Sequence, residues 1–369
     1  MALLRPTWIE IDLKALAYNV SLVRRRVGPD VRIFAVVKSH GFGCGAAISA
    51  RAAIEGGADA VAVGDPHDAR EIRDAGIDVP ILLYASTPPD MAAEVASLDV
   101  TVTIHDLDSL HAFAAAGRPV EAFMKAEVGL GRLGVPEADW ESVFEVAQSS
   151  DNLALTGVYT HLNAPDDRDW IMAQIAVYER ACAGAEAHGF RDLTRMVASS
   201  HVVLGYSELR YNAVNPGRFL FGLVEGRWAE VDHARPVMAA IKSRIIQTKT
   251  FAAGDVVGFL GPEPLTGPTR LAVLPIGFGD GFNHLAPLGE LLVEGQRAPI
   301  VGRRGIEHTV IDVTRVPGAE VGSEAVLLGA QGHSEITPDE LAGWLGLPVL
   351  ELLPRLARTL PKVYLQENL

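Results

Sequence analysis

One lysine stands where a protein could attach a carbonyl compound. Lys38 ends the apolar, β-branched run 31–37 and is followed by the glycine-rich turn 39–45, SHGFGCG. A buried strand that delivers an amine to its carboxyl end, beside glycines that leave room for a ligand, favours a Schiff-base lysine over a structural one. A surface lysine that simply follows a strand is the alternative, because such lysines are common before loops.

Strand patterns and alanine-rich, helix-like stretches alternate through the first two thirds of the chain. Strands are predicted at 32–38, 60–64, 81–85, 100–105, 120–126, 155–161 and 196–199, and an eighth near Phe219. Eight strands that alternate with helices are typical of a parallel (β/α)8 barrel of the TIM type. A doubly wound sheet is the alternative, but it rarely reaches eight such units.

The sequence pattern changes after Pro236. Alternating strand patterns at 241–246, 271–276 and 325–328 are separated by turns rich in glycine and proline, and helical stretches are few before Glu340. We therefore expect a barrel domain over 1–235 and a second, mainly β domain over 236–369.

Composition excludes several classes of protein. The 369 residues are 49% hydrophobic, which is enough for a large core, and the formal net charge of −14 disfavours a nucleic-acid partner. Two cysteines give no disulfide framework, and the N-terminus lacks the apolar core of a signal peptide. No apolar run reaches the roughly 20 residues of a membrane helix. We expect a cytoplasmic protein without a membrane partner.

Polar residues gather at the carboxyl ends of the predicted strands, where a parallel barrel carries its chemistry. Besides Lys38 they are Arg132, His161, Ser199, Ser200, Asn215, Gly217 and Arg218. The loops after the last two strands of such barrels often bind phosphate, which favours Ser200, Gly217 and Arg218 as a cofactor-phosphate site. An amine, a phosphate cradle and a flat histidine together indicate pyridoxal 5′-phosphate (PLP).

Six segments, in order along the chain, resemble the landmarks of one family. They are RPTWIEID at 5–12, AVVK at 35–38, GRLG at 131–134, YTH at 159–161, IGFGDG at 276–281 and PKVY at 361–364. The chain is similar over essentially its full length to the alanine racemases, which are PLP enzymes of fold type III. The resemblance implies a barrel followed by a β domain, a homodimer, and active sites that the partner's β domain completes.

The resemblance also implies roles for single residues. Lys38 would be both the Schiff-base residue and the base on one face of the substrate Cα. His161 would lie at the pyridine ring, and Arg132 would anchor a phenolic oxygen or the substrate carboxylate. Ser199, Ser200 and Gly217 would fall on the phosphate-binding loops, with helix capping as the alternative for the serines.

Lys125 corresponds to a lysine that is often carbamylated in this family and then braces the arginine. An ordinary lysine paired with Glu127 is the alternative. No metal site is expected from the sequence.

Several site positions depart from the family pattern. Phe278 stands where the family has the tyrosine that serves as second base, and a phenyl ring has no ionisable proton. Phe42 and Leu350 replace two further tyrosines, and Asn215 replaces the arginine that faces the pyridine nitrogen. In the loop that enters the partner's substrate pocket, Ile306 and Glu307 replace a methionine and an aspartate. Arg218 stands where the family has an apolar residue, and it offers a charge to a phosphate or an acidic substrate. An ordinary surface arginine is the alternative.

These departures make two-base racemisation doubtful. We expect an isomerase-like PLP enzyme of amino-acid metabolism with altered chemistry at Cα: transamination, aldol-type reaction or decarboxylation. Racemisation with a substitute base, supplied by His40, Cys44, His284 or His308, is a further candidate. An active alanine racemase and a non-catalytic PLP-binding protein are the alternatives, and the retained β domain argues against the second.

Overall fold

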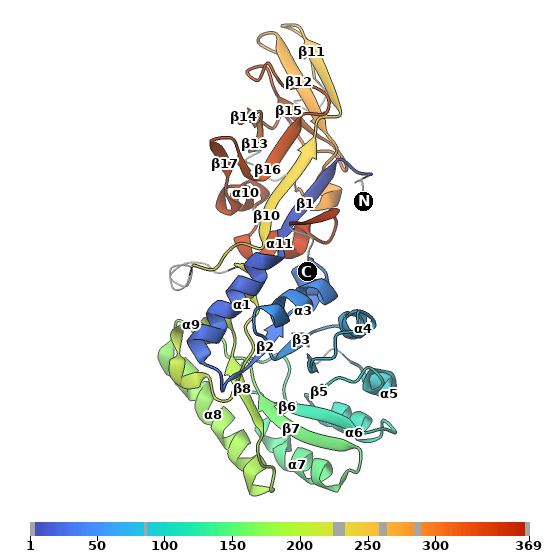
Figure 1. Cartoon of the computed structure of the whole chain (residues 1–369), viewed down its shortest axis with the longest axis vertical. Helices are drawn as coiled ribbons and strands as arrows, with labels where there is room; N and C mark the ends of the chain where they lie inside the picture. Colours follow the sequence, from blue (N-terminus) through green and yellow to red (C-terminus); the bar gives the residue numbers. More distant parts are fainter. Residues whose placement is uncertain (1–3, 85–86, 224–232, 258–263, 284–288, 366–369) are drawn as a thin grey trace. The chain divides into compact units, whose positions relative to one another are not determined.

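The chain folds into two compact units. The computed structural model describes residues 4–84, 87–223, 233–257, 264–283 and 289–365. One unit is Lys14–Arg235, and the other combines Met1–Leu13 with Pro236–Leu369. Both are drawn in Figure 1, where the colours follow the sequence from blue to red.

Eight parallel strands form the sheet of the unit Lys14–Arg235, in the order β4-β3-β2-β9-β8-β7-β6-β5. They are β2 (Arg32–Val36), β3 (Ala60–Val63), β4 (Ile81–Leu83), β5 (Val102–Ile104), β6 (Val120–Lys125), β7 (Leu153–Tyr159), β8 (Thr194–Ala198) and β9 (Ala213–Val214). The two outer strands meet at a parallel bridge between Leu82 and Thr101, where the Leu83 N–H donates to the Thr101 carbonyl at 2.8 Å. The sheet therefore closes, and the predicted (β/α)8 barrel is confirmed.

Helices cover the outside of this barrel (Figure 1). They are α1 (Leu13–Val27), α3 (Ala46–Glu55), α4 (Pro66–Asp74), α5 (Ala92–Ala96), α6 (Leu107–Ala114), α7 (Trp140–Ser149), α8 (Arg168–Ala187) and α9 (Ser200–Gly205). The short segment α2 (Lys38–Phe42) follows β2 and has left-handed backbone angles over most of its length. Aspartates cap the starts of several of them, as where the Asp65 carboxylate accepts the His67 N–H at 2.9 Å. Such caps satisfy backbone donors that a helix start leaves without partners.

The barrel strands are buried on both faces. Phe34 and Val36 of β2 point inward and pack with apolar residues from six other strands, namely Ala60, Ala62, Leu82, Phe123, Tyr159, Met196 and Ala213. Ile33 and Ala35, on the opposite face of β2, are fully buried as well. This double burial explains why the strands read as continuous apolar runs rather than as alternating patterns.

The eighth strand lies earlier in the chain than we predicted. It is the two-residue β9, which pairs with β2 and β8, whereas Phe219 belongs to the 3₁₀ turn η4 (Arg218–Phe221). The apolar run Phe219–Phe221 is buried in either case, and a short buried run cannot be assigned to strand or helix from its apolarity alone.

The N-terminal strand belongs to the other unit, which corrects the predicted barrel domain of 1–235. β1 (Thr7–Asp12) pairs antiparallel with β10 (Met238–Arg244) and parallel with β18 (Lys362–Leu365). In Figure 1 it is the blue strand among yellow to red ones. Ile9 and Ile11 are fully buried there. The barrel unit thus begins at α1 rather than at residue 1.

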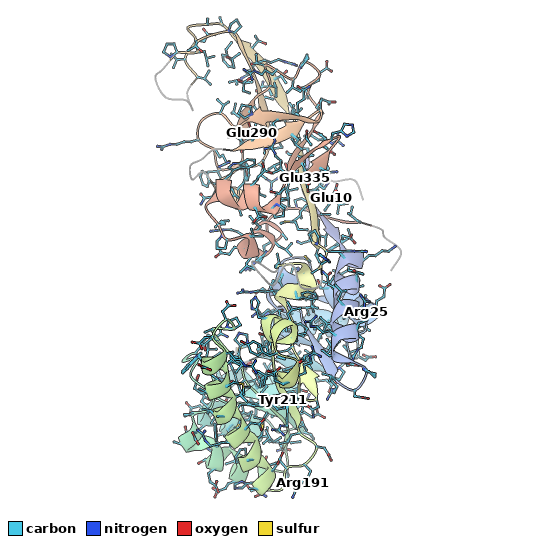
Figure 2. The ribbon with its side chains drawn as sticks, turned by 90° about the vertical axis from the view of Figure 1, so that its left-hand side faces the viewer. Glu10, Arg25, Arg191, Tyr211, Glu290 and Glu335 are labelled. Carbon is cyan, nitrogen blue, oxygen red and sulfur yellow. The ribbon has the colours of Figure 1, made fainter. Side chains whose placement is uncertain are left out.

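The second unit is mainly β, as its sequence predicts. One sheet has the order β14-β13-β16-β10-β1-β18, with β17 beside β16, and a three-stranded sheet has the order β11-β12-β15. The remaining elements are β11 (Gln247–Phe251), β12 (Thr269–Leu274), β13 (Glu290–Val293), β14 (Gln296–Pro299), β15 (Thr309–Asp312), β16 (Glu324–Gln331), β17 (Ser334–Ile336), α10 (Pro338–Leu345) and α11 (Val349–Leu356). Figure 2 marks Glu10, Glu290 and Glu335 on this unit, and Arg25, Arg191 and Tyr211 on the barrel.

Within the described residues, no helix combines the length and the apolarity that a membrane crossing requires. The cytoplasmic location and the lack of a nucleic-acid partner stay predictions from the sequence.

Candidate functional site

Four cationic side chains come together at the mouth of the barrel. Lys38 follows β2, Lys125 ends β6, Arg132 lies in the loop after β6, and Arg218 begins η4 after β9. Arg132 lowers the pKa of both lysines, and Arg218 also lowers the pKa of Lys38. Such mutual effects require short distances, because water and salt screen distant charges. The structure therefore brings together the residues that the strand-end rule selected.

Loss of solvation and like charge make both lysines easier to deprotonate, although Lys38, unlike the buried Lys125, is still exposed to solvent. Loss of solvation is the main cause of the lowered pKa of Lys38, followed by Arg132 and Arg218. Lys125 is buried, and its pKa falls to about 8, mainly through burial and then through Arg132. Both effects disfavour the charged ammonium and raise the fraction of free amine near neutral pH.

His161 stands among these cations as a neutral imidazole. Its pKa is lowered to about 4, mainly by burial and then by the positive charges of Arg132, Lys38, Lys125 and Arg218, in that order of importance. A neutral imidazole still offers one N–H donor and one acceptor nitrogen. His161 can thus orient a ligand by hydrogen bonds without adding to the positive charge.

Glu127 shapes the loop that carries Arg132. Its carboxylate accepts the Gly129 N–H at 2.5 Å and the Gly131 N–H at 3.1 Å. Burial opposes its ionisation, but these backbone donors outweigh burial and lower the pKa of Glu127. Glu127 also raises the pKa of Lys125, because its negative charge stabilises the ammonium form of that lysine. The carboxylate is engaged chiefly with the loop backbone rather than reserved for that lysine.

Asn215, directly after β9, has a buried side-chain carbonyl oxygen. The Asn215 amide donates to the Tyr84 hydroxyl at 3.1 Å, while its carbonyl oxygen Oδ1 is buried and has no hydrogen-bond partner among the described residues. A buried acceptor without a partner is costly and usually marks a place that a ligand or water completes.

Two tyrosines that we did not select from the sequence, Tyr84 and Tyr159, lie next to Asn215 and to each other. The Tyr84 and Tyr159 rings lie 5.8 Å apart between centroids, and the Tyr159 hydroxyl is 3.0 Å from the Thr103 hydroxyl. Burial raises the pKa of both tyrosines, so their hydroxyls stay protonated. Tyr84 directly follows β4 and Tyr159 ends β7, but the predicted strands 81–85 and 155–161 run past both residues, so the strand-end rule did not select them.

The residues expected on the phosphate loops also meet. The Ser200 hydroxyl accepts the Gly217 N–H at 3.0 Å and the Phe219 N–H at 3.1 Å. A side chain at Gly217 would place its Cβ 3.3 Å from Val36 Cβ and 3.6 Å from Phe42 Cζ. The glycine thus lets the chain pass close to β2 and to Phe42. Ser199 precedes α9 as its N-cap residue.

The other residues singled out from the sequence lie in the second unit. They are Phe278 in the 3₁₀ turn η6 (Phe278–Asp280), Ile306 and Glu307 in the loop before β15, and Leu350 in α11. The two loops are joined, because the Phe278 N–H donates to the Gly305 carbonyl at 3.0 Å and the Gly279 N–H to the Ile306 carbonyl at 2.9 Å. Phe278 and Ile306 are 41% and 62% exposed, which is high for large apolar side chains.

A bidentate ion pair supports the loop of Phe278. Arg5 donates to both carboxylate oxygens of Asp280 at 2.7 and 2.6 Å, and the second oxygen also accepts the Gly277 N–H at 3.0 Å.

Of the candidate substitute bases, Cys44 is buried, His308 is exposed, and His284 lies outside the described residues.

A closed parallel barrel with two amines and two guanidinium groups at its mouth is typical of enzymes that bind small anionic compounds. Comparison with known proteins is more specific. Residues 11–225 match the model of the alanine racemase N-terminal domain, and residues 238–364 match that of the C-terminal domain.

Relatives and solved structures agree with these matches. The alanine racemase of Desulforamulus reducens is 31% identical over 372 residues, covering 98% of this chain and 99% of that protein. The alanine racemase structure from Streptomyces coelicolor is 31% identical with a TM-score of 0.86, covering 98% of each chain. That of Bacillus anthracis with bound L-Ala-P is 25% identical with a TM-score of 0.91, covering 100% of this chain and 97% of the other.

The chain therefore belongs to the alanine racemase family. PLP, the cofactor expected from the sequence, is the cofactor of this chain.

The low pKa of His161 predicts a pH-dependent contribution to stability. As the pH falls from 7 to 5, the unfolded chain protonates this histidine while the folded chain resists, so the free energy of unfolding decreases. In the cofactor-free protein, urea unfolding should show a decrease about 1–2 kcal/mol larger for the wild type than for His161→Gln. Equal decreases in the two proteins would show that His161 titrates normally.

Proposed function

We propose that this protein is a PLP-dependent enzyme that acts at the Cα of an amino acid, with Lys38 as the base on one face. The four cations at the barrel mouth carry this proposal. Like charges in a partly buried site repel one another unless anions neutralise them. A phosphate dianion and a substrate carboxylate supply that neutralisation.

The residues at the mouth fit the cofactor. Lys38 offers an amine with a lowered pKa to the aldehyde, and Arg218 adjoins the Ser200 and Gly217 loops expected to take the phosphate. The unpartnered Asn215 oxygen offers an acceptor to a ring atom that carries a proton. When bound, PLP supplies an electron sink that stabilises negative charge at the substrate Cα.

Each nearby side chain then has a definite task. The free amine of Lys38 takes a proton from Cα and returns it, and its lowered pKa favours this at neutral pH. Arg132 binds a carboxylate or phenolate oxygen as a fork of two N–H donors. His161 donates a hydrogen bond as a neutral group and so leaves the charge balance unchanged.

Two reactions are candidates for this site. The names of the relatives, which match along the whole chain, favour racemisation of alanine. Phe278 favours chemistry with proton transfer on one face only, because a phenyl ring cannot take a proton. Transamination then begins with loss of the Cα proton, whereas aldol-type cleavage and decarboxylation break another bond of Cα. A non-catalytic PLP-binding role is disfavoured by the complete second unit.

Proton exchange in deuterated water distinguishes the two reactions. With Lys38 as the single base, deuterium should enter the Cα of one enantiomer of a small amino acid at least ten times faster than that enantiomer is inverted. Mass spectrometry and chiral chromatography of a panel of D- and L-amino acids measure the two rates. Lys38→Ala should abolish both.

Phe278→Tyr serves as the companion variant. It should raise the inversion rate of alanine severalfold and change exchange little, because a phenol can move a proton where a phenyl cannot. Inversion as fast as exchange in the wild type would instead identify a racemase with another second base.

We propose that Lys125 is carbamylated, and its lowered pKa supports this. A free amine adds to CO2 with loss of a proton, and the resulting anion would offset the charge of Arg132. The holoenzyme prepared in ¹³C-bicarbonate should show one protein-bound carbamate carbon signal that Lys125→Ala lacks. A spectrum without that signal would leave Lys125 as an ordinary lysine held by Glu127.

We propose a homodimer in which the exposed Phe278 and Ile306 of one protomer are covered by its partner. Exposed apolar side chains on two loops that hydrogen bonds join are typical of such surfaces. Light scattering of the holoenzyme should give about twice the 39.4 kDa of the chain. A monomer at micromolar concentration would contradict this.

A further inference from the structure

The four residues after Lys38 form a left-handed turn. Ser39, His40, Gly41 and Phe42 have φ values of 55°, 56°, 62° and 52°. Three of the four are not glycine, and L-residues disfavour this conformation because Cβ approaches the next carbonyl. Left-handed stretches of non-glycine residues are rare and persist only where their surroundings hold them. The segment joined directly to the proposed cofactor lysine therefore needs an external support.

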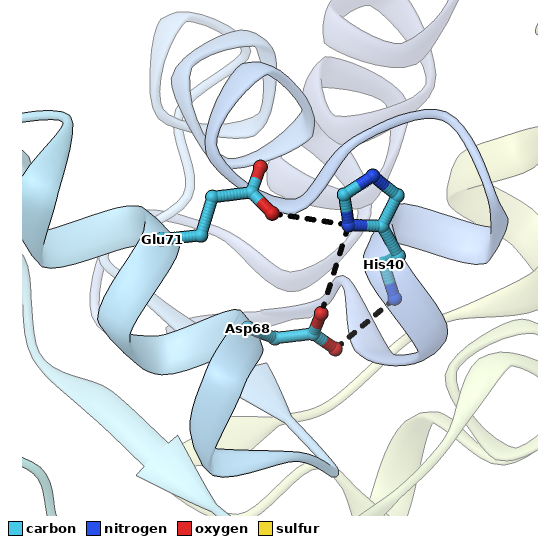
Figure 3. Close-up of side chains that lie close together, drawn as sticks. All are labelled: His40, Asp68 and Glu71. Atoms are coloured by element: carbon cyan, nitrogen blue, oxygen red, sulfur yellow. Dashed lines mark hydrogen bonds and ion pairs between the residues drawn. The ribbon is translucent and has the colours of Figure 1, made fainter.

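Two acidic side chains of α4 supply that support (Figure 3). Asp68 is buried, and its Oδ2 accepts the His40 backbone N–H at 3.0 Å. Glu71 lies one helical turn further, and its Oε2 is 3.0 Å from His40 Nδ1. We call Asp68 and Glu71 the α4 clamp. It fixes both the backbone and the ring of the residue at the centre of the left-handed turn.

The clamp also reaches the helix that follows the turn. Glu71 Oε1 accepts the Ala47 N–H at 3.0 Å, in the first turn of α3. Histidine and carboxylates are metal-ligand types, but here two of the four carboxylate oxygens accept the backbone N–H groups of His40 and Ala47, and a third lies 3.0 Å from His40 Nδ1. The arrangement is that of a brace between α4, the turn and α3.

The second half of the turn, Gly41 and Phe42, packs against α3 and η4, whereas Ser39 and His40 are exposed. A Cβ on Gly41 would lie 2.5 Å from Ser49 Oγ of α3, and the Phe42 ring lies 4.5 Å from the Phe221 ring of η4. The Gly45 N–H donates back to the His40 carbonyl at 2.8 Å. His40 is thus held at its backbone N–H, its ring and its backbone carbonyl. These contacts fix the backbone conformation between Lys38 and α3.

We propose that Asp68 and Glu71 are positioning residues for Lys38. By holding the turn 39–42 left-handed, the α4 clamp fixes the backbone from which the Lys38 amine reaches the cofactor and the substrate. The inference rests on the proposed function of Lys38. It assigns a role to two residues of α4 that the strand-end rule does not select.

The test compares the PLP-loaded wild type with Asp68→Ala, Asp68→Asn and Glu71→Gln. Asp74→Ala is the matched control, because it makes the same change at an exposed position of the same helix. Two readouts are followed: hydrogen exchange of the amides 39–45, and the circular dichroism of the cofactor absorption band, which reports the orientation of the bound cofactor.

Asp68→Ala should speed exchange of amides 39–45 by about tenfold or more, because a hydrogen bond to a charged acceptor is lost. The cofactor dichroism should decrease while amides of β7 and α8 keep the exchange rates of the control. Asp68→Asn retains an acceptor oxygen and should restore most of both signals. Glu71→Gln should give a smaller change in the same direction, which also serves if Asp68→Ala does not fold.

Exchange and dichroism equal to those of Asp74→Ala, in both Asp68→Ala and Glu71→Gln, would overturn the proposal. Faster exchange with unchanged dichroism would also overturn it, because the clamp would then support the turn without positioning the lysine. If the wild type binds no cofactor at Lys38, the proposed function fails. The exchange readout then still shows whether the clamp holds the turn.

Discussion

Repulsion between like charges at the barrel mouth is the constraint on which the account depends. Lys38, Lys125, Arg132 and Arg218 each perturb at least one of the others or His161, and the burial of Lys125 strengthens the effect at that amine. A site of this kind is unfavourable when empty and gains from every anion that enters. Together with loss of solvation, which is the larger cause, the same repulsion keeps His161 neutral and lowers the pKa of the two amines. The charges that favour anion binding thus also assist proton transfer.

Barrel closure is what creates this concentration of charge. The carboxyl ends of parallel strands meet at one end of the barrel, so residues far apart in the sequence share a small volume. The bridge between Leu82 and Thr101 completes the ring, and the inward Phe34, Phe123 and Met196 fill the interior below. The apolar filling also excludes water beneath the site, which raises the cost of the buried polar atoms such as Asn215 Oδ1 that face no partner.

The sequence predicts the barrel and most of the site because both follow from local patterns. Continuous apolar runs mark seven strands, and the strand-end rule then selects Lys38, Arg132, His161 and Ser200 without knowledge of contacts. The sequence pattern does not predict that β1 forms a sheet with β10 and β18, since that pairing joins residues more than 200 positions apart. The position of β9 was wrong because two residues make no pattern. The α4 clamp was missed because Asp68 and Glu71 resemble ordinary polar residues of a surface helix, and only the left-handed path of residues 39–42 brings His40 to them.

The residue that carries the cofactor is the central feature of the proposed site. Borohydride reduction of the protein loaded with PLP, followed by digestion and peptide mass spectrometry, locates that residue. We expect a single reduced adduct on the peptide that contains Lys38, since its amine follows β2 and has a lowered pKa. An adduct on Lys125, or no stable adduct at all, would contradict the assignment of the barrel mouth as the catalytic site.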